Sequence, residues 1–484
     1  MRLLLIDDDA EQLKVFNELL PDRTPGIEIF QASNLADARA LIEARRFDVA
    51  VVDLRLPTTA DATDEADEHG IAIIEKIRAE LPGTPTIILT GYGSMELVQR
   101  TYKRYMQDGM PFGGKSFRLF EVITKENLRD CFTALAEMQV DWQALSDIEL
   151  EFGARVPRLA EDDKRILKAA TRSFGCVKAE VGVLAGGLSE ATTYRFVASD
   201  DNGRIRTIAA AKIASPDAVR REKRAFESYV AGMLRPGSFA TLLSEIQPAG
   251  TIMSGLFYRL ADAGTSGQMI SFFDLIARTE HERVHAPVEQ LAILCEPWTR
   301  NRSVTRRAVG DIRRELIDDE SFRNVDRGLF EETREVERRT VTVALCSQHR
   351  DLHGENILVQ PDMTLMLIDF AHVREAPAGL DSIILEMSLL THQRGRAIAG
   401  EWPTVGMASS WCDVDAYTGE GTPELVRHFV RACRAWGQQV AGGFNALAAC
   451  GYAYAIRQLR FPDVDADVMR AIARGSANRL LESG

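Results

Sequence analysis

The chain of 484 residues is long enough for about three domains of ordinary size, or for two if one of them is large. Its 45% hydrophobic and 27% charged residues are typical of globular protein and exclude a wholly disordered chain. The formal net charge of −13 excludes a global basic surface for nucleic acid or anionic membranes. The seven cysteines are scattered, which favours reduced thiols. The apolar start Leu3–Ile6 ends at Asp7 and no run of 18 apolar residues follows, so we expect a cytoplasmic protein without signal peptide or membrane span.

The first 140 residues alternate short apolar runs with amphipathic stretches. We expect buried strands at Leu3–Ile6, Val49–Asp53, Thr86–Thr90 and Phe120–Thr124. We expect helices at Asn34–Arg45, with Ser33 as the N-cap, and at Ile71–Leu81. This alternation predicts an α/β doubly wound parallel sheet, with a functional crevice beyond the carboxyl ends of its strands. The acidic stretch Thr58–His69 is interpreted as a solvated insertion in a loop.

Polar side chains follow the ends of these predicted strands. Asp7 and Asp8 follow the first strand, Asp53 ends the second, Thr90 ends the third, and Lys125 follows the last. Three carboxylates at one place repel one another unless a cation lies among them, and oxygen ligands suit hydrated Mg²⁺. A carboxylate beside Mg²⁺ can accept a phosphoryl group, whose charge the metal and a lysine balance. A threonine hydroxyl that bonds the acyl phosphate would give the domain two states.

Residues 1–140 resemble the receiver domain of two-component response regulators. The resemblance rests on LLLIDDD at 3–9, VVDLRLP at 51–57, ILTGYG at 88–93 and VITKEN at 122–127. It implies a flavodoxin-like fold in which Asp53 accepts a phosphoryl group from a sensor histidine kinase, while Asp7, Asp8 and Asp53 hold Mg²⁺. It makes Thr90 the switch hydroxyl and Lys125 the lysine that contacts the phosphate, with Lys115 as the alternative. A receiver-like module that is never phosphorylated and serves in docking is the competing interpretation, and the resemblance also allows a homodimer through this domain.

The remaining sequence predicts a connector and a second domain. Residues 141–175 are charged and helical in pattern, as in Glu161–Ser173, and are interpreted as a helical connector. The second domain, residues 176–484, begins with strand-like sequence and becomes mainly helical after Ser271. The basic stretch Arg300–Arg314 is interpreted as a solvated helix face. Because no C-terminal helix-turn-helix is evident, no direct DNA binding is expected.

The most informative stretch of the second domain is HRDLHGENILV at 349–359, which LIDF follows at 367–370. Asp351, Asn356 and Asp369 form the set that phosphoryl transfer needs. One aspartate acts as the base for the attacking hydroxyl, while the asparagine and the second aspartate hold Mg²⁺ on the phosphates of ATP. An alternative zinc site lacks an obvious fourth ligand and would use Cys346, His349 and His353.

Residues upstream of this stretch could complete a nucleotide site. A loop with Gly186, Gly187 and Ser189 lies between the predicted strands Val181–Leu184 and Thr192–Val197, and its backbone N–H groups can approach phosphate. Lys212 lies in the apolar run Ile208–Ile213, where a charge is costly unless it is paired or points into a cleft. The helix that follows offers Glu222 as the preferred partner and Glu227 as the alternative. A lysine that extends from an edge strand into solvent is the competing interpretation.

In order and spacing these parts resemble the α+β two-lobed protein-kinase-like fold. The resemblance is to the aminoglycoside phosphotransferase and choline kinase group and, more loosely, to bacterial ternary-complex-associated kinase-like domains. It implies an N-lobe at about 176–263, with adenine against Leu256–Ala263, and a helical C-lobe at about 264–484. It implies binding of ATP and Mg²⁺ with these contacts: Lys212 on the phosphates, Glu222 paired with it, Asp351 as base, and Asn356 and Asp369 on Mg²⁺.

The sequence after the second aspartate sets this domain apart from ordinary protein kinases. Only eleven residues separate Asp369 from Asp381, so a long activation segment has no room. Asp381 lies where the group often carries an aspartate that supports the catalytic loop. The first hypothesis is therefore an ATP-dependent phosphotransferase for a small-molecule or protein hydroxyl, controlled by the receiver. The second is a pseudokinase that relays the state of the receiver to a partner without catalysis.

Overall fold

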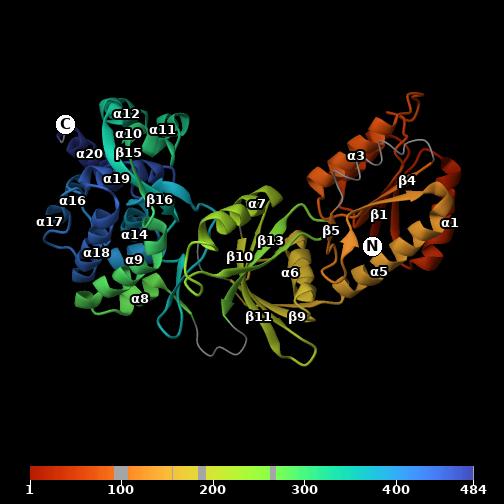
Figure 1. Cartoon of the computed structure of the whole chain (residues 1–484), viewed down its shortest axis with the longest axis horizontal. Helices are drawn as coiled ribbons and strands as arrows, with labels where there is room; N and C mark the ends of the chain where they lie inside the picture. Colours follow the sequence, from red (N-terminus) through yellow and green to blue (C-terminus); the bar gives the residue numbers. More distant parts are fainter. Residues whose placement is uncertain (92–106, 155, 184–191, 262–268, 483–484) are drawn as a thin grey trace. The chain divides into compact units, whose positions relative to one another are not determined.

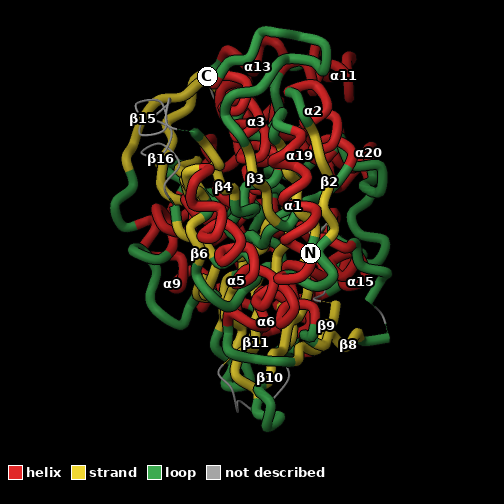
Figure 2. The backbone as a smooth tube through the Cα atoms, turned by 90° about the vertical axis from the view of Figure 1, so that its right-hand side faces the viewer, coloured by secondary structure: helices red, strands yellow, loops and turns green. Residues whose placement is uncertain are grey.

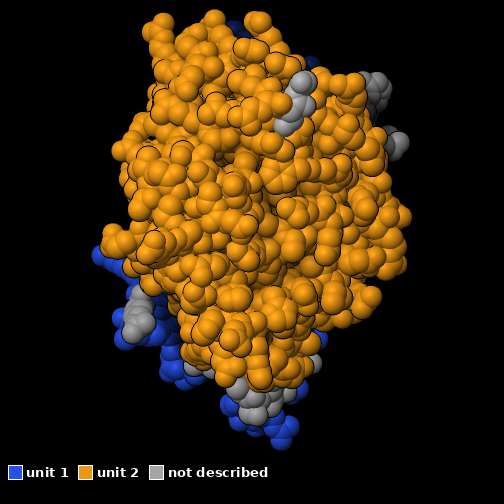
Figure 3. All heavy atoms as spheres, turned by 90° about the vertical axis from the view of Figure 1, so that its left-hand side faces the viewer, with its two compact units in different colours: residues 1–220, 242–265 blue, residues 221–241, 266–484 orange. Residues whose placement is uncertain are grey.

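The structure, a computed structural model, describes residues 1–91, 107–154, 156–183, 192–261 and 269–482. The contacts divide the chain into two compact units (Figure 3). Unit 1 comprises residues 1–220 and 242–265, and unit 2 comprises residues 221–241 and 266–484. The boundary falls within helix α7 (Pro216–Ala225) and not at the predicted boundaries near residues 140 and 175.

Unit 1 begins with a five-stranded parallel sheet in the order β2-β1-β3-β4-β7 (Figure 1). Its strands are β1 (Arg2–Ile6), β2 (Glu28–Ala32), β3 (Val49–Val52), β4 (Thr86–Thr90) and β7 (Phe120–Thr124). Its helices are α1 (Ala10–Arg23), α2 (Leu35–Ala44), α3 (Asp67–Glu80) and α5 (Leu128–Ser146). This strand order is the flavodoxin-like one, so the predicted doubly wound sheet is confirmed.

Helices cover both faces of this sheet. Alternate residues of a strand point to opposite faces, so Leu3 and Leu5 of β1 join the core formed with α1 and α5. Leu4 and Ile6 join the core formed with α2 and α3. In Figure 2 the neighbouring strands β3 and β4 lie among these helices. Burial on both faces explains why β1, β3 and β4 are nearly continuous apolar runs in the sequence, whereas the edge strand β2 is partly exposed.

Two helices of this domain begin elsewhere than predicted. Asn34, and not Ser33, caps α2, because its side-chain oxygen accepts a hydrogen bond of 2.9 Å from the Asp37 N–H. Helix α3 begins at Asp67 instead of Ile71. Its first turn is acidic and polar, which suits the positive end of the helix dipole but is invisible to apolar periodicity.

The predicted insertion Thr58–His69 forms a closed loop of mostly exposed residues. An antiparallel bridge joins Leu56 to Ala66 at its base. Within the loop, Asp64 accepts hydrogen bonds of 3.0 Å from the Thr58 N–H and 2.7 Å from the Thr58 hydroxyl. The loop is therefore ordered by its own bonds, although it is solvated as predicted.

The rest of unit 1 is built on a six-stranded sheet in the order β12-β13-β11-β10-β9-β8, with helix α6 (Glu161–Ser173). The strands are β8 (Glu149–Phe152), β9 (Lys178–Val183), β10 (Thr192–Ser199), β11 (Ile205–Ala214), β12 (Thr241–Ile246) and β13 (Ser254–Ala261), and a short ribbon of β5 (Asp108–Gly109) and β6 (Phe117–Arg118) precedes them. Strand β8 pairs in parallel with β9. Helix α6 has the predicted bounds Glu161–Ser173, but the predicted helical connector also contains strand β8, which is too polar to show a strand pattern in the sequence.

One hydrophobic core runs through both parts of unit 1. Phe112, Ile166 and Phe257 belong to the same cluster as Leu3 and Phe16 of the first sheet. Two polar contacts reinforce this core. The Arg165 guanidinium pairs with the carboxylate of Asp48 and donates to the Ala249 carbonyl at 2.9 Å. The Arg172 guanidinium lies 2.7 Å from the Asp141 carboxylate. The shared core explains why contacts place no boundary near residue 140.

Unit 2 is mainly helical and contains two three-stranded sheets, β14-β17-β18 and β15-β16-β19. Its strands are β14 (Ile270–Ser271), β15 (Ser303–Ala308), β16 (Thr340–Gln348), β17 (Ile357–Val359), β18 (Leu365–Leu367) and β19 (Arg374–Pro377). Its helical segments are η2 (Phe226–Val230), α8 (Phe272–Arg278), η3 (His281–Arg283), α9 (His285–Thr299), α10 (Val309–Arg314), α11 (Asp319–Val325), α12 (Arg327–Glu332), α13 (Arg334–Arg338), α14 (Leu380–Thr391), α15 (Gln393–Ala399), α16 (Val405–Ser409), α17 (Val414–Tyr417), α18 (Glu424–Val440), α19 (Phe444–Gln458) and α20 (Ala466–Glu482). Among the described residues, none of the helices combines the length and hydropathy that a membrane span requires.

The basic stretch Arg300–Arg314 differs from its prediction. It forms strand β15 and the short helix α10, and Arg313 is fully buried. The Arg313 guanidinium lies 2.6 Å from Asp319 and donates a hydrogen bond of 2.9 Å to Glu337. The prediction of solvated side chains is correct for Arg300, Arg302, Arg306 and Arg314. It is wrong for Arg313, because carboxylates from later in the chain neutralise this arginine and allow its burial.

Candidate functional site

Three carboxylates meet at the carboxyl ends of two neighbouring strands. Asp7 and Asp8 follow β1, and Asp53 follows β3, which pairs with it in parallel. One oxygen from each of these residues lies within 4.8 Å of the others. Asp7 and Asp53 are buried, whereas Asp8 is exposed. In an open α/β sheet this edge, where the strand order reverses, is where ligands bind.

Lys125 completes this acidic site. It directly follows β7, and its Nζ lies 2.6 Å from Asp53 Oδ2 and 2.9 Å from Asp7 Oδ2. The alternative, Lys115, is engaged through its backbone N–H with Asp141 at 3.2 Å. Thr90 ends β4, beside β3, and its hydroxyl donates a hydrogen bond of 3.1 Å to the Gly91 carbonyl.

The carboxylates of this site carry more negative charge than Lys125 balances, so a bound cation would stabilise them. Burial raises the pKa of Asp7 to about 6 and also raises that of Asp53, although hydrogen bonds from Lys125 oppose the effect. Burial works against the charge of Lys125, yet hydrogen bonds to both carboxylates raise its pKa. One ammonium thus faces three carboxylates. Oxygen-only ligands with excess negative charge fit Mg²⁺, and Asp7, Asp8 and Asp53 are the residues that would hold it.

In unit 2, a buried aspartate holds the loop between β16 and β17. The carboxylate of Asp381, in the first turn of α14, accepts hydrogen bonds of 2.7 Å from the His349 N–H and 2.8 Å from the Arg350 N–H. His349 Nε2 donates to the Ile368 carbonyl at 3.0 Å, and burial lowers the pKa of its ring to about 4, so the ring is neutral at pH 7. These bonds fix the backbone immediately before Asp351.

The same loop contains Asp351 and Asn356, and Asp369 follows strand β18. The Asn356 amide donates to the Asp351 carbonyl at 2.8 Å and to its Oδ2 at 3.3 Å. Strands β17 and β18 pair antiparallel, and the Ile368 N–H donates to the Asn356 carbonyl at 3.0 Å. Asp369, the next residue, therefore lies at the same end of this ribbon as Asn356. Its φ of +64° is a left-handed conformation that a non-glycine residue rarely adopts and that is common at functional sites.

The Asp351 carboxylate stays ionised at neutral pH. Burial alone would raise its pKa, but the His353 ring, whose Nε2 lies 3.7 Å from Asp351 Oδ2, and the nearby Arg457 guanidinium lower it well below its usual range. The His353 ring stacks on His392, with ring centroids 3.8 Å apart. Sequence reasoning missed His392 and Arg457, because neither belongs to a spaced motif.

The alternative zinc site finds no support among the described residues. Cys346 Sγ accepts a hydrogen bond of 3.3 Å from Gln348, while His349 is bonded to the Ile368 carbonyl. Among the described residues, Asp7, Asp8 and Asp53 form a cluster of three metal-binding side chains, and no such cluster includes Cys346.

The residues predicted to contact nucleotide are distributed over both units. Lys212 is buried in β11 of unit 1, opposite Thr193 of β10 and Leu256 of β13. In α7, Glu222 is buried, whereas Glu227 is exposed in η2. Gly186, Gly187 and Ser189 lie outside the described residues. The nucleotide contacts of all these residues stay predictions.

Comparison with known proteins identifies the first domain. Residues 3–111 match the family model of the response regulator receiver domain. The photosynthetic apparatus regulatory protein RegA of Cereibacter sphaeroides is 34% identical over 93 residues, which are 19% of this chain and 45% of RegA. The acid tolerance regulatory protein ActR of Rhizobium meliloti is 34% identical over 93 residues, 19% of this chain and 42% of ActR. The chain thus spans less than half the length of these relatives.

Solved structures also match parts of this chain. A CheY-like receiver domain protein from Methanospirillum hungatei JF-1 shares 26% identity, covering 29% of this chain and 95% of its own, with a TM-score of 0.23. Choline kinase LicA from Streptococcus pneumoniae shares 15% identity, covering 62% of this chain and 92% of its own, with a TM-score of 0.32. Such TM-scores carry no argument by themselves. The family match and the acidic site at the strand ends lead to one conclusion: the amino-terminal part of this chain is a response regulator receiver domain.

Proposed function

We propose that this chain is a two-component signalling protein in which phosphorylation of Asp53 controls an ATP- and Mg²⁺-dependent phosphotransferase. A receiver domain implies a phosphodonor such as a sensor histidine kinase. The single observation that supports the output activity is the loop held by Asp381, because it presents Asp351 and Asn356 at the end of the β17–β18 ribbon from which Asp369 follows. The acceptor of the proposed reaction is a hydroxyl group.

The receiver step uses the acidic site at β1 and β3. A carboxylate oxygen of Asp53 forms a bond to phosphorus as the bond between phosphorus and the donor breaks. Asp7, Asp8 and Asp53 would hold Mg²⁺, which would neutralise charge on the phosphoryl oxygens when bound. In the unphosphorylated protein Lys125 Nζ lies 2.6 Å from the Asp53 carboxylate. After phosphorylation, Lys125 contacts the new phosphoryl group instead. Thr90, at the end of β4, is the proposed switch hydroxyl.

In the proposed output step, Asp351, Asn356, Asp369 and Asp381 each have one task. Asp351, ionised at neutral pH, orients the acceptor hydroxyl and takes its proton as the γ-phosphoryl group is transferred. Asn356 and Asp369 are the proposed ligands of the Mg²⁺ that accompanies ATP. Asp381 is a positioning residue, because it acts through the backbone of His349 and Arg350.

The shared core of unit 1 supports control by the receiver. Lys125 begins the short 3-10 helix that leads directly into α5. Near its carboxyl end, α5 presents Asp141 to Arg172 of α6, and α6 packs on the six-stranded sheet. When phosphorylation changes the contacts of Lys125, this continuous path can pass the change to the sheet that carries Lys212.

Calorimetry of Mg-ATP binding and an assay of ATP turnover test the proposal on the full chain. We expect Asp369→Asn to weaken Mg-ATP binding. We expect Asp351→Asn to bind Mg-ATP like the wild type but to lose turnover by about 10²-fold, the usual contribution of a general base. Wild-type protein that does not bind Mg-ATP would contradict the proposal. Binding without turnover or transfer to any acceptor would favour the pseudokinase.

A further inference from the structure

A cavity of about 300 Å³ lies beside the catalytic loop of unit 2. We call it the arginine cavity, because its charged lining is Arg350, Arg374, Arg457, Arg460, His372 and Glu315. Arg350 directly precedes Asp351, and the segment Ala371–Val373 of its wall follows two residues after Asp369. The cavity therefore borders both chain segments that carry the proposed chemistry.

Two of these arginines converge on a single oxygen. Arg350 and Arg374 donate hydrogen bonds of 2.6 and 2.8 Å to the Glu315 carbonyl, which keeps their Nη2 atoms within about 5.4 Å of each other. Two like charges at this distance repel each other, because protein sites screen charges less than bulk water does. A neutral carbonyl oxygen does not cancel that repulsion.

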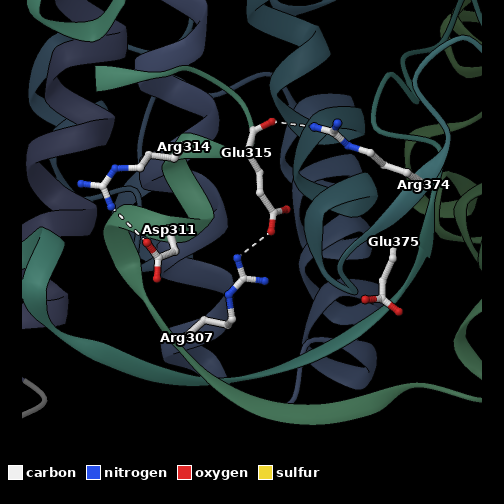
Figure 4. A pocket seen from close by; sticks show the side chains of 6 residues that line it. All are labelled: Arg307, Asp311, Arg314, Glu315, Arg374 and Glu375. Atoms are coloured by element: carbon white, nitrogen blue, oxygen red, sulfur yellow. Dashed lines mark hydrogen bonds and ion pairs between the residues drawn. The ribbon is translucent and has the colours of Figure 1, made fainter. Parts of the chain in front are cut away.

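No carboxylate on the described wall of the cavity is free to balance these charges. The Glu315 carboxylate turns away and pairs with Arg307 at 2.8 Å, in the neighbouring cavity shown in Figure 4. Arg350 is only 7% exposed, and its Nε is buried without a hydrogen-bond partner. A buried guanidinium N–H without an acceptor among the described residues is costly, so the charge of Arg350 is not fully satisfied within the described part of the chain.

A third arginine of this wall is held in place by aromatic rings. The Arg457 guanidinium lies 5.6 Å from the ring centroid of Tyr454 and 5.9 Å from that of Phe461. Such contacts restrict the side chain and prepare it for a ligand. Planar guanidinium groups bind phosphate and carboxylate oxygens in pairs, so an oxyanion matches this lining.

We propose that the arginine cavity binds a phosphate or carboxylate group of the phosphoryl acceptor. The inference rests on the proposed function and adds the substrate class: an anionic hydroxyl compound, and not a neutral or cationic one. The volume of about 300 Å³ is at the lower end of the range for small-molecule sites, so the acceptor is a small molecule.

Titration of the full chain with inorganic phosphate, followed by calorimetry, tests the site without any need for ATP. We expect one saturable site that weakens about tenfold or more in Arg374→Gln and in Arg457→Gln, since each removes a charge-assisted hydrogen bond. Arg431→Gln is the matched control, because Arg431 is paired with Asp415 on the surface of α18. Absence of saturable binding, or equal binding in all variants, would overturn the site.

A second experiment tests whether the bound anionic group belongs to the phosphoryl acceptor. ATP-dependent transfer is measured to a sugar phosphate, the parent sugar and the matching amino sugar. We expect transfer to the anionic compound, with a KM raised about tenfold and a retained kcat in Arg374→Gln, whose exposed position leaves folding intact. Transfer only to the neutral or cationic compound would overturn the inference. Phosphate binding without any ATP turnover would refute the proposed function and leave the anion site standing.

Discussion

Replacing Asp7 by asparagine should stabilise the metal-free protein at neutral pH. Asp7 is 1% exposed and shares its site with two other carboxylates. Burial raises its pKa from the ordinary value of 3.8 to about 6, so keeping it ionised works against folding. A difference of about two pKa units corresponds to about 3 kcal/mol. Because Asp7→Asn also takes a charged partner from Lys125, we expect a net gain of about 2 to 3 kcal/mol.

The destabilising effect of the Asp7 charge should depend on pH in a definite direction. A carboxyl group whose pKa is raised by folding binds its proton more tightly in the folded state, so its destabilising effect is absent below about pH 4. The effect grows between pH 4 and pH 6 and is fully present at pH 7. The advantage of Asp7→Asn over the wild type should therefore shrink to less than about 1 kcal/mol at pH 4.

Hydrogen exchange of the amides of β1 and β3 measures this effect in the full chain. At pH 7 without Mg²⁺, exchange in Asp7→Asn should be slower than in the wild type by about 30-fold or more, since 1.4 kcal/mol is a factor of ten. Mg²⁺ should stabilise the wild type and not the variant. Asp8→Asn is the control, because the substitution removes a proposed metal ligand but, since Asp8 is exposed, removes no buried charge. Exchange in Asp7→Asn as fast as in the wild type would refute the reasoning.

Three further predictions address the phosphoacceptor, the core of unit 2 and the core of unit 1. A small phosphodonor with Mg²⁺ should add one phosphoryl group to the wild type and none to Asp53→Asn; equal mass gain in both proteins would argue against Asp53. Arg434→Leu should lower the free energy of unfolding by about 3 to 5 kcal/mol in chemical denaturation, because Glu386 would be left buried and unpaired, whereas Arg431→Leu on the same helix should change it little. Arg165→Ala should speed hydrogen exchange in α6 and β3 together, because it leaves the carboxylate of Asp48 buried without its guanidinium; faster exchange in only one of them would disprove the shared core.

Much of the receiver domain could be predicted from the sequence, because its information is local. Strands buried on both faces are continuous apolar runs, and parallel strands bring their carboxyl ends to one edge. The positions of Asp7, Asp53 and Lys125 in the chain were therefore enough to place them at one site. The loop around Asp351 was also evident, because its residues follow one another within a few positions. The helix starts at Asn34 and Asp67 were less clear, since a polar first turn carries no apolar periodicity.

What only the tertiary structure decided involves partners that lie far apart in the sequence. Arg165 and Asp48 are 117 positions apart, and their pairing joins the two parts of unit 1. Arg313 became a buried residue, not a solvated one, because Asp319 and Glu337 neutralise it. The arginine cavity likewise collects side chains from four separate segments. A charge is buried or exposed according to the sum of desolvation and pairing, and a sequence shows the charge but not the partner that long-range folding brings to it.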